Sequence, residues 1–262
     1  GAMIDTLIEA IAQKERVAVM LSGGLDSAVL AKLAHEALGE KALAITIESP
    51  IVAFNEIEDA MKIAREIGIA HEIIPINELN DREFATNQPN RCYICRKLRN
   101  RSAREVAAEF SIATLADGIN YDDLKDYRPG KKAADEDNIW HPFVELKLSK
   151  QSVRQLAHKL KLTVSDKHSE ACLCSRIAYG ITINQDLLER IEKAENLLKT
   201  ICEGPLRVRC LPYDLAMIDA ADQEGAMRAR SKIVSALREF GFAFVCLDLE
   251  GFVSGKLNRI IT

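Results

Sequence analysis

The chain has 262 residues, of which 48% are hydrophobic and 28% charged, with only 13 glycines and 7 prolines. This composition excludes a disordered or collagen-like chain, and no apolar run reaches the roughly 18 residues that a membrane-spanning helix needs. The formal net charge of −4 gives no overall attraction for nucleic acid, so the sequence disfavours a nucleic-acid or membrane partner.

The cysteine content needs a chemical explanation. Gly1-Ala2-Met3 is typical of the scar left after removal of a purification tag, and no signal-peptide pattern follows it. Seven cysteines without an export signal indicate reduced thiols rather than a disulfide scaffold. We therefore expect a cytoplasmic protein.

The first half of the chain alternates short apolar runs with helical periodicity. Strands are predicted, in chain order, at residues 17–21, 42–47, 72–76 and 112–116. Helices are predicted between them at about residues 26–38, 57–67 and around 106–110. This alternation predicts right-handed βαβ units, and hence an α/β domain with a doubly wound parallel sheet.

The pattern changes after residue 180. The expected order is a helix, two strands, a helix and a strand, at residues 185–200, 206–210, 215–218, 226–240 and 244–249. We therefore predict two domains, a nucleotide-binding domain over 1–180 and a smaller α+β domain over 181–262 for substrate binding or oligomerisation. Functional residues are expected in three long irregular segments, at about 77–94, 118–138 and 163–182.

A glycine-rich loop follows the first predicted strand and precedes a helix. Its sequence is Ser22-Gly23-Gly24-Leu25-Asp26-Ser27. Glycines let backbone N–H groups approach an anion, the serines add hydroxyl donors, and a helix N-terminus adds partial positive charge. The loop therefore predicts an anion cradle, with a plain turn capped by Asp26 or Ser27 as the alternative. No lysine stands in the Walker-A position, which disfavours a phosphoryl-transfer P-loop.

The SGGLDS motif resembles the loop of the pyrophosphatase-loop ATPases, whose fold is adenine nucleotide alpha-hydrolase-like. These enzymes split ATP into AMP and pyrophosphate while they adenylate a substrate. The resemblance implies ATP and Mg²⁺ as cofactors and a role for Asp26 in adenylation. It also implies a nucleotide site made of Ser22, Gly23, Gly24, Asp26, Ser27, Thr46, Asp117, Gly118 and Asn120.

Two short cysteine motifs lie in the irregular segments. Cys92 and Cys95 form a C-x₂-C, and Cys172 and Cys174 form a C-x-C. Thiols at such spacings can converge on one metal. Inert buried thiols, a Cys₄ zinc site and an iron–sulfur cluster on three cysteines all remain open, although the gap between the pairs is longer than in ordinary zinc ribbons.

Beyond the loop, nearly the whole chain resembles the LarE family, the ATP-dependent sulfur transferases of nickel-pincer cofactor synthesis. The motifs that carry the resemblance are NRCYICRK at 90–97, DGINYDDLKDYRPG at 117–130, CLCSRIAYG at 172–180, LRVR at 206–209 and LDLEGFVSGKLN at 247–258. The family adenylates the carboxylates of a pyridinium-3,5-dicarboxylate mononucleotide and converts each into a thiocarboxylate. The resemblance therefore implies this small-molecule substrate, sulfide or another sulfur donor, and a homo-oligomer.

The resemblance also implies roles for individual residues. Members with the C-x₂-C are thought to bind a [4Fe–4S] cluster, which here implies Cys92, Cys95 and Cys172 as ligands, with Cys174 as the alternative third ligand. Other members sacrifice the sulfur of a single cysteine. Cys172 and Arg176 are implied in catalysis, where Arg176 either favours the thiolate or serves as a structural ion-pair partner. The weakest candidate is His168, as a proton shuttle.

The implied substrate-binding residues are Ser175, Arg207 and Arg209. The two arginines alternate with Leu206 and Val208, so both face one side of a predicted strand. Two guanidinium groups on one face suit bidentate capture of a phosphate, and an ordinary exposed sheet face is the equal alternative.

Three other functions remain open. A tRNA-thiolating enzyme predicts a basic surface. An amide-forming enzyme of the NAD-synthetase kind leaves the C-x₂-C unexplained. A regulatory protein that binds nucleotide and metal without turnover predicts that ATP stays intact.

Overall fold

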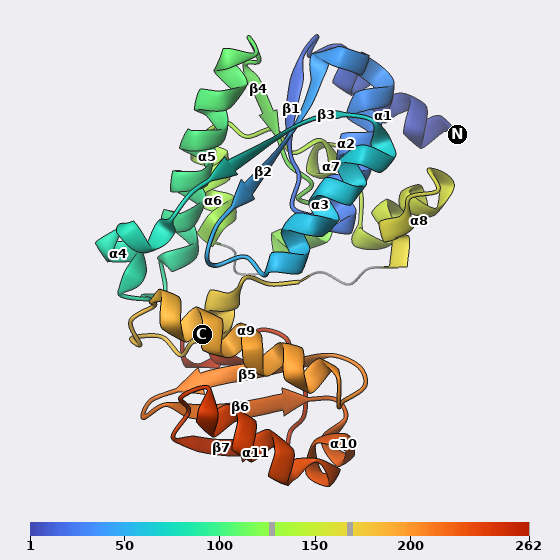
Figure 1. Ribbon diagram of the computed structural model, residues 1–262. Coiled ribbons are helices and arrows are strands. Elements are labelled where there is room, and N and C mark those ends of the chain that lie inside the picture. The colour runs from blue at the N-terminus through green and yellow to red at the C-terminus, as the bar shows by residue number, and fades with distance from the viewer. Residues whose placement is uncertain (126–128, 167–169, 262) are drawn as a thin grey trace. The chain divides into compact units, whose positions relative to one another are not determined.

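The computed structural model describes residues 1–125, 129–166 and 170–261 (Figure 1). Residues 126–128 of the DGINYDDLKDYRPG motif lie outside the described residues, and so does the proton-shuttle candidate His168. No described helix is both long enough and apolar enough to cross a membrane.

The chain divides into two compact units. Unit 1 comprises Gly1–Asn77 and Cys92–Glu170, and unit 2 comprises Glu78–Arg91 and Ala171–Thr262. A single boundary after residue 180 was expected from the sequence. The structure instead assigns two earlier stretches to unit 2, one before Cys92 and the other before residue 181.

Hydrogen bonds within unit 2 explain this division. The Asn87 side chain donates to the Ala178 carbonyl at 2.9 Å, and the Ile183 N–H donates to the Ala85 carbonyl at 2.9 Å. Ile177 also forms an isolated parallel bridge with Cys210. The early segment is therefore part of the fold of the C-terminal unit.

Unit 1 contains a four-stranded parallel sheet. Its strands are β1 (Val17–Met20), β2 (Ala42–Glu48), β3 (Ala70–Pro75) and β4 (Thr114–Ala116), in the order β3-β2-β1-β4. Val17 pairs with Ala42 of β2 on one side and with Thr114 of β4 on the other. The sequence prediction of a parallel sheet is confirmed, with strand ends that differ by a few residues.

Helices cover both faces of this sheet. They are α1 (Ala2–Ala12), α2 (Leu25–Leu38), α3 (Phe54–Ile67), α5 (Arg91–Glu109), α6 (Pro129–Glu136), α7 (Pro142–Glu145) and α8 (Lys150–Lys159). Val17 and Val19 pack in a core with α1, α2, α3 and α8, whereas Ala18 packs in a second core with α5 and α6. Alternate strand residues point to opposite faces, so the sheet is doubly wound, as predicted. Figure 1 shows α5 and α6 on one side of it and α1, α2 and α3 on the other.

Unit 2 is a smaller α+β fold, as predicted. Its elements are α4 (Arg82–Ala85), α9 (Gln185–Lys199), β5 (Leu206–Leu211), β6 (Leu215–Ala220), α10 (Gln223–Arg228), α11 (Arg230–Glu239) and β7 (Phe244–Leu247). The sheet order is β5-β6-β7, with β5 and β6 antiparallel and β6 and β7 parallel. The helix predicted at 226–240 is instead two helices that meet at Ala229.

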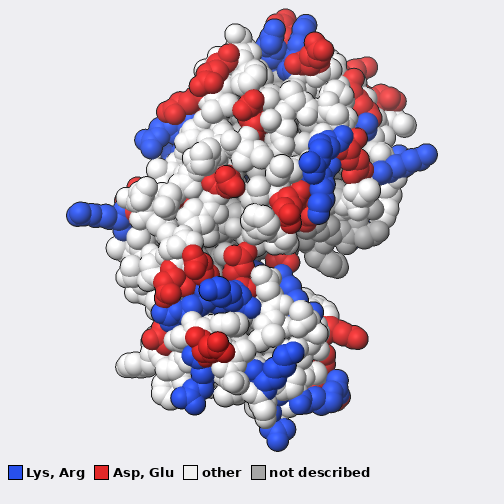
Figure 2. Space-filling view, in the orientation of Figure 1, with Lys and Arg blue, Asp and Glu red and all other residues white. Residues whose placement is uncertain are grey.

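Charged side chains of both signs are interspersed on the surface. On the face shown in Figure 2, Lys and Arg lie among Asp and Glu over both units. This distribution agrees with the small net charge of −4.

Candidate active site

The glycine-rich loop joins β1 to α2. The Ser27 hydroxyl accepts a hydrogen bond from the Ser22 backbone N–H at 3.1 Å and donates one to the Gly24 carbonyl at 3.2 Å. These bonds fold the loop over the first turn of α2, where backbone N–H groups carry partial positive charge. The loop therefore has the geometry that an anion cradle requires.

Two glycines allow the close approach of backbone in this region. Gly23 has φ of +79°, and a Cβ atom there would lie 2.6 Å from the Glu56 carbonyl oxygen. A Cβ atom on Gly118 would lie 2.7 Å from both the carbonyl carbon of Asp26 and the backbone nitrogen of Ser27. The segment that follows β4 therefore lies directly against the start of α2.

Asp117 directly follows β4, and its buried carboxylate bonds to other residues of unit 1. Its carboxylate accepts hydrogen bonds from the Ile119 N–H at 3.1 Å and from His141 Nδ1 at 2.6 Å, and it pairs with Arg96. Burial alone would raise the pKa of Asp117, but Arg96 and His141 outweigh it and hold the pKa below the ordinary value. Asp117 thus fixes the loop that carries Gly118 and Asn120.

Asp26 is the acidic group of the nucleotide loop. Its Oδ2 accepts hydrogen bonds from Lys150 Nζ at 2.6 Å and from Asn120 Nδ2 at 3.2 Å. Its Oδ1 is buried and has no hydrogen-bond partner among the described residues. Burial raises the pKa of this carboxyl, although Lys150 and Asn120 oppose the rise. An oxygen in this state suits a divalent cation, since Mg²⁺ binds through one or two carboxylates together with substrate phosphates.

Lys150 is a site residue that the sequence analysis missed. It begins α8, whose N-cap Ser149 accepts a hydrogen bond from the Ser152 N–H at 3.1 Å. The serine before an amphipathic stretch could have marked this helix start. Its contact with Asp26 could not be found in this way, because 124 residues separate the two in the chain.

Thr46 lies in β2, below the nucleotide loop. Its hydroxyl donates to the Leu21 carbonyl at 2.7 Å and lies 2.7 Å from His71 Nε2. Burial lowers the pKa of His71, and because the hydroxyl proton is used for Leu21, Nε2 donates to Thr46. The predicted nucleotide residue Thr46 therefore supports the backbone that leads into the loop.

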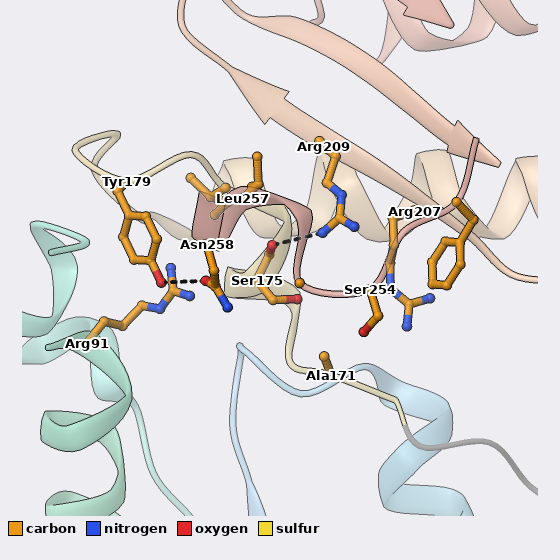
Figure 3. Close-up of a pocket in the computed structure, with 12 residues that line it drawn as sticks. Arg91, Ala171, Ser175, Tyr179, Arg207, Arg209, Ser254, Leu257 and Asn258 are labelled. Carbon is orange, nitrogen blue, oxygen red and sulfur yellow. Dashed lines mark hydrogen bonds between the residues drawn. The ribbon is translucent and has the colours of Figure 1, made fainter. Parts of the chain in front are cut away.

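A second candidate site is a cavity of about 190 Å³ within unit 2 (Figure 3). Arg207 and Arg209 reach it from β5, and Figure 3 shows Arg91 at its other end. Ser175 and Ser254 also line it. The predicted substrate residues Ser175, Arg207 and Arg209 are thus brought together around one concave surface with a positive charge.

Aromatic rings orient two of the cavity arginines. The Arg91 guanidinium lies 5.1 Å from the centre of the Tyr179 ring, and that of Arg207 lies 5.5 Å from the centre of Phe252. The Tyr179 hydroxyl donates to Asn258 Oδ1 at 3.0 Å. Arg91 Nη1 also donates to the Asn87 side chain and to the Cys174 carbonyl, and Arg207 Nη1 donates to the Leu206 carbonyl at 2.8 Å. Arginines stacked on aromatic rings are common in sites that recognise phosphate or carboxylate.

Arg209 differs from Arg207 in its surroundings. Its Nε and Nη2 both donate to Asp219 Oδ2, at 3.1 and 2.8 Å, and its Nη1 donates to the Ser175 carbonyl at 3.2 Å. Arg209 and Asp219 are buried, and Lys256 Nζ contacts the other Asp219 oxygen at 3.1 Å. Arg209 therefore holds the cavity wall, whereas Arg207 is half-buried.

Arg176 forms a buried ion pair. Its Nε and Nη2 donate to the two carboxylate oxygens of Glu195, at 2.9 and 3.2 Å. Its Nη1 donates to the Cys172 carbonyl at 2.9 Å, and the Ser175 hydroxyl donates to the same carbonyl at 2.8 Å. This arrangement favours the structural ion-pair role for Arg176, through which it positions the backbone of Cys172.

The four motif cysteines differ in accessibility. Cys92 is exposed and Cys95 half-buried, one turn apart at the start of α5 in unit 1. In unit 2, Cys172 is half-buried and Cys174 is 0% exposed. Among the described residues, no three His, Cys, Asp or Glu side chains are grouped as metal ligands.

Burial raises the pKa of Cys210 to about 11, so this thiol is protonated at neutral pH and inert.

Comparison with known proteins supports the nucleotide site. Residues 2–119 match the family model of NAD synthase. The tRNA-specific 2-thiouridylase MnmA of Nitrobacter winogradskyi is 26% identical over 66% of this chain, and the match covers 52% of that enzyme. The first match spans the first strand and the glycine-rich loop, and the two matches together indicate a pyrophosphatase-loop nucleotide domain.

Two relatives match along nearly the whole chain. The uncharacterized protein slr1717 of Synechocystis sp. is 38% identical over 99% of this chain and 98% of its own length. The pyridinium-3,5-bisthiocarboxylic acid mononucleotide synthase of Lactiplantibacillus plantarum is 31% identical over 98% of this chain and 94% of its own length. The chain therefore belongs to the LarE family of ATP-dependent sulfur transferases, within the pyrophosphatase-loop enzymes.

Proposed function

We propose that the protein uses ATP to convert the carboxylates of pyridinium-3,5-dicarboxylate mononucleotide into thiocarboxylates. The observation that carries this proposal is the full-length similarity to the L. plantarum synthase, together with the SGGLDS loop. In the first step a carboxylate oxygen attacks the α-phosphorus of ATP and pyrophosphate leaves. In the second step sulfide attacks the acyl carbon and AMP leaves.

The nucleotide site lies at the end of β1 in this proposal. Backbone N–H groups at Gly23, Gly24 and the start of α2, with the hydroxyls of Ser22 and Ser27, hold the phosphates. Asp26 Oδ1 is a buried oxygen that fits Mg²⁺, which when bound would neutralise charge that builds on the phosphates. Gly118 and Asn120 keep Asp26 in place.

The cavity of unit 2 takes the substrate in this proposal. Arg207, stacked on Phe252, binds the phosphate of the mononucleotide with its N–H edge, while Arg209 and Ser175 shape the wall. Arg91 adds a second stacked guanidinium for an oxyanion of the same substrate. Two separated cationic groups suit a molecule that carries a phosphate and carboxylates.

Sulfur delivery is assigned to Cys172 with Cys92 and Cys95. What supports a [4Fe–4S] cluster is the thiol chemistry and the spacing of Cys92 and Cys95, one helical turn apart, with Cys172 half-buried. The described residues do not bring three such ligands together, so the proposal requires that cluster binding does so. When bound, such a cluster would supply sulfide for the acyl adenylate. We propose Cys172 rather than Cys174 as the third ligand, because Cys172 is half-buried and Cys174 is fully buried.

The proposed reaction also requires a sulfur source and reduced thiols. Inorganic sulfide or another sulfur donor restores the sulfur after each turnover. The thiols must stay reduced for this chemistry, so we propose that the protein works in the cytoplasm. A homo-oligomer is proposed from the family resemblance alone, and light scattering of the purified protein tests it.

The test follows the products of the reaction. Oxygen-free protein is mixed with ATP, Mg²⁺, sulfide and the dicarboxylate mononucleotide, and pyrophosphate, AMP and thiocarboxylate are measured. We expect Cys92→Ala, Cys95→Ala and Cys172→Ala to abolish thiocarboxylate formation and leave ATP binding intact, with the exposed Cys246→Ala as the control. Full multiple turnover in all three variants contradicts the cluster mechanism. If the protein binds ATP but leaves it intact when the substrate is present, the proposal that it is an enzyme is wrong.

Metal analysis of the same protein separates the sulfur mechanisms. About four irons per chain with equal acid-labile sulfide support the cluster. Stoichiometric zinc supports a structural Cys₄ site, and an amide-forming enzyme then becomes the alternative function. Metal-free, active protein supports a sacrificial cysteine, which is checked by the loss of one sulfur from the Cys172 peptide after a single turnover.

Thiolation of tRNA is the second candidate function. The match to the 2-thiouridylase of N. winogradskyi favours it, although this chain corresponds to only 52% of that enzyme. The mixed charge on the face in Figure 2 gives it no support. If tRNA rather than the mononucleotide stimulates pyrophosphate release, this candidate replaces the first.

A further inference from the structure

We propose that Lys256 is the positioning residue of the arginine-lined cavity of unit 2, and that binding of the mononucleotide depends on it. This inference rests on the proposed function, which puts the substrate in that cavity. Lys256 belongs to the wall segment, residues 251–258, and Figure 3 shows several residues of this segment around the cavity. Those that line the cavity are Phe252, Ser254, Gly255, Leu257 and Asn258.

The Lys256 ammonium group is buried among oxygen atoms. The side chain is 7% exposed, and Nζ donates to the Gly251 carbonyl at 2.7 Å, to Asp219 Oδ1 at 3.1 Å and to Asp248 Oδ2. Burial alone would lower the pKa of Lys256, but the bonds to Asp248 and Asp219 outweigh it and raise the pKa. Lys256 is therefore charged at neutral pH, and its three N–H donors have three acceptors.

Asp219 joins Lys256 to Arg209. Arg209 donates twice to Asp219 Oδ2, so the two oxygens of one fully buried carboxylate hold two cations. Arg209 Nη2 also donates to the Val253 carbonyl of the wall segment at 3.1 Å. Loss of Lys256 would leave Asp219 Oδ1 without this bond, and the members of a buried polar network depend on one another. Lys256 therefore fixes the carboxylate that orients Arg209.

Gly251 joins Lys256 to Arg207. The Lys256 ammonium holds the Gly251 carbonyl, which belongs to the peptide that leads into Phe252. Gly251 has φ of +76°, a left-handed conformation that glycine adopts without strain. The Arg207 guanidinium lies 5.5 Å from the centre of the Phe252 ring. Lys256 therefore also holds the ring on which Arg207 stacks.

The two arginines share a strand but not a side-chain direction. Both backbones are set by β5, whereas the contacts of Lys256 set where the guanidinium groups lie. Capture of a phosphate by two guanidinium groups needs both at a fixed place, because a hydrogen bond weakens steeply when its donor is misaligned. Loss of Lys256 should therefore weaken mononucleotide binding. It should spare the nucleotide loop, which lies in unit 1 and shares no partner with Lys256.

The first test measures binding of the dicarboxylate mononucleotide by calorimetry on the full chain, together with its KM and kcat. We expect Lys256→Met to raise Kd and KM by about tenfold or more, the effect of losing a hydrogen bond between charged groups. The change in kcat should stay below about threefold, and that in ATP affinity below about twofold. Lys232→Met removes the same charge from an exposed position on α11 and is the matched control, which should change none of these.

The second test separates positioning from a general loss of structure. Lys256→Ala lacks three carbons and an ammonium group, which n-propylammonium supplies. We expect this cation to restore mononucleotide binding to the variant, whereas propan-1-ol, which has the same carbons without the charge, should not. Circular dichroism checks that each variant is folded. If Lys256→Met does not fold, Lys256→Gln takes its place and should weaken binding too, because its shorter amide cannot reach all three acceptors.

The outcomes distinguish the inference from the proposed function. If a folded Lys256→Met variant binds the mononucleotide like the wild type, the inference is wrong and the proposed function stands. Equal losses of mononucleotide and ATP affinity, or equal restoration by the cation and the alcohol, also overturn the inference. A wild type that binds ATP but not the mononucleotide overturns both.

Discussion

At the scale of single residues, the fold treats two aspartates in opposite ways. Asp26 follows β1 and is buried with one oxygen that has no described partner, so its pKa is raised. Asp117 follows β4 and is buried too, but Arg96 and His141 more than offset the burial and its pKa is lowered. The sequence placed both in a nucleotide site, and it could not tell them apart because their partners are distant in the chain.

Asp26→Asn should raise the free energy of unfolding at pH 7. The folded protein disfavours the ionised Asp26, so ionisation of this group opposes folding above its raised pKa. The gain should shrink as the pH falls through the raised pKa and vanish below the ordinary value of 3.8. Urea unfolding at a series of pH values measures it.

Asp117→Asn should act in the opposite direction. The lowered pKa means that ionised Asp117 stabilises the fold above 3.8, and this stabilisation is lost as the pH falls through the folded-state pKa. The variant should therefore be less stable than the wild type at pH 7, and the difference should narrow in acid. Two variants that shift stability in the same direction at pH 7 would contradict the pKa directions.

Gly118→Ala should damage the nucleotide site. The added Cβ would lie 2.7 Å from backbone atoms of Asp26 and Ser27, which cannot move as a flexible side chain would. We expect a loss of about 1–3 kcal/mol in stability, the usual effect of overpacking, and weaker ATP binding. Thermal unfolding and calorimetry measure the two effects. Gly130→Ala is the control, since its Cβ would meet nothing closer than 3.6 Å and it should be neutral or stabilising.

At the scale of elements, most of the fold could be predicted because its signals are local. Apolar runs between loops marked each strand, and three-to-four residue spacing marked α2, α3 and α9. The break at Ala229, with φ of −97° and ψ of 13°, was missed because alanine continues a helical pattern. An ion pair was one of the two roles expected for Arg176, but its partner Glu195 was not identified, since nothing in the local sequence links a turn to the middle of α9.

Glu195→Ala should destabilise unit 2 strongly. Glu195 is buried in α9, where it accepts both Arg176 bonds and a third from the Val208 N–H of β5 at 3.1 Å. Its removal leaves a buried guanidinium without its carboxylate, which costs about 3–5 kcal/mol. Urea unfolding measures this change in the free energy of unfolding. Glu189→Ala, exposed on the same helix, should cost about 0.5 kcal/mol or less, and equal effects would rule out the buried pair as the cause.

At the scale of the whole molecule, the candidate functional residues are divided between two units. The nucleotide loop, Lys150 and the C-x₂-C lie in unit 1, whereas the arginine-lined cavity and Cys172 lie in unit 2. Sequence analysis found the residues of both groups except Lys150. It drew the boundary at residue 180, because a change in periodicity marks elements and not the contacts of a segment such as 78–91.

A fragment of residues 181–262 should not fold by itself. It lacks the 171–180 turn with Arg176, and the 78–91 segment whose Asn87 bonds to Ala178. A fragment that joins 78–91 to 171–262 through a flexible linker restores both and should fold. Circular dichroism and thermal unfolding compare the two, and a cooperative transition in the shorter fragment would show that the early segment is dispensable.

The split composition of unit 2 has a consequence for synthesis on the ribosome. Residues 78–91 are synthesised before residues 92–170 of unit 1. The rest of unit 2, which they pack against, begins only at residue 171. During this interval Phe84, which is buried in the finished protein, has no completed core to enter. Nascent chains of this protein therefore carry the 78–91 segment without its partners, and Phe84 outside any core, for about 80 residues of elongation, or several seconds at ordinary rates.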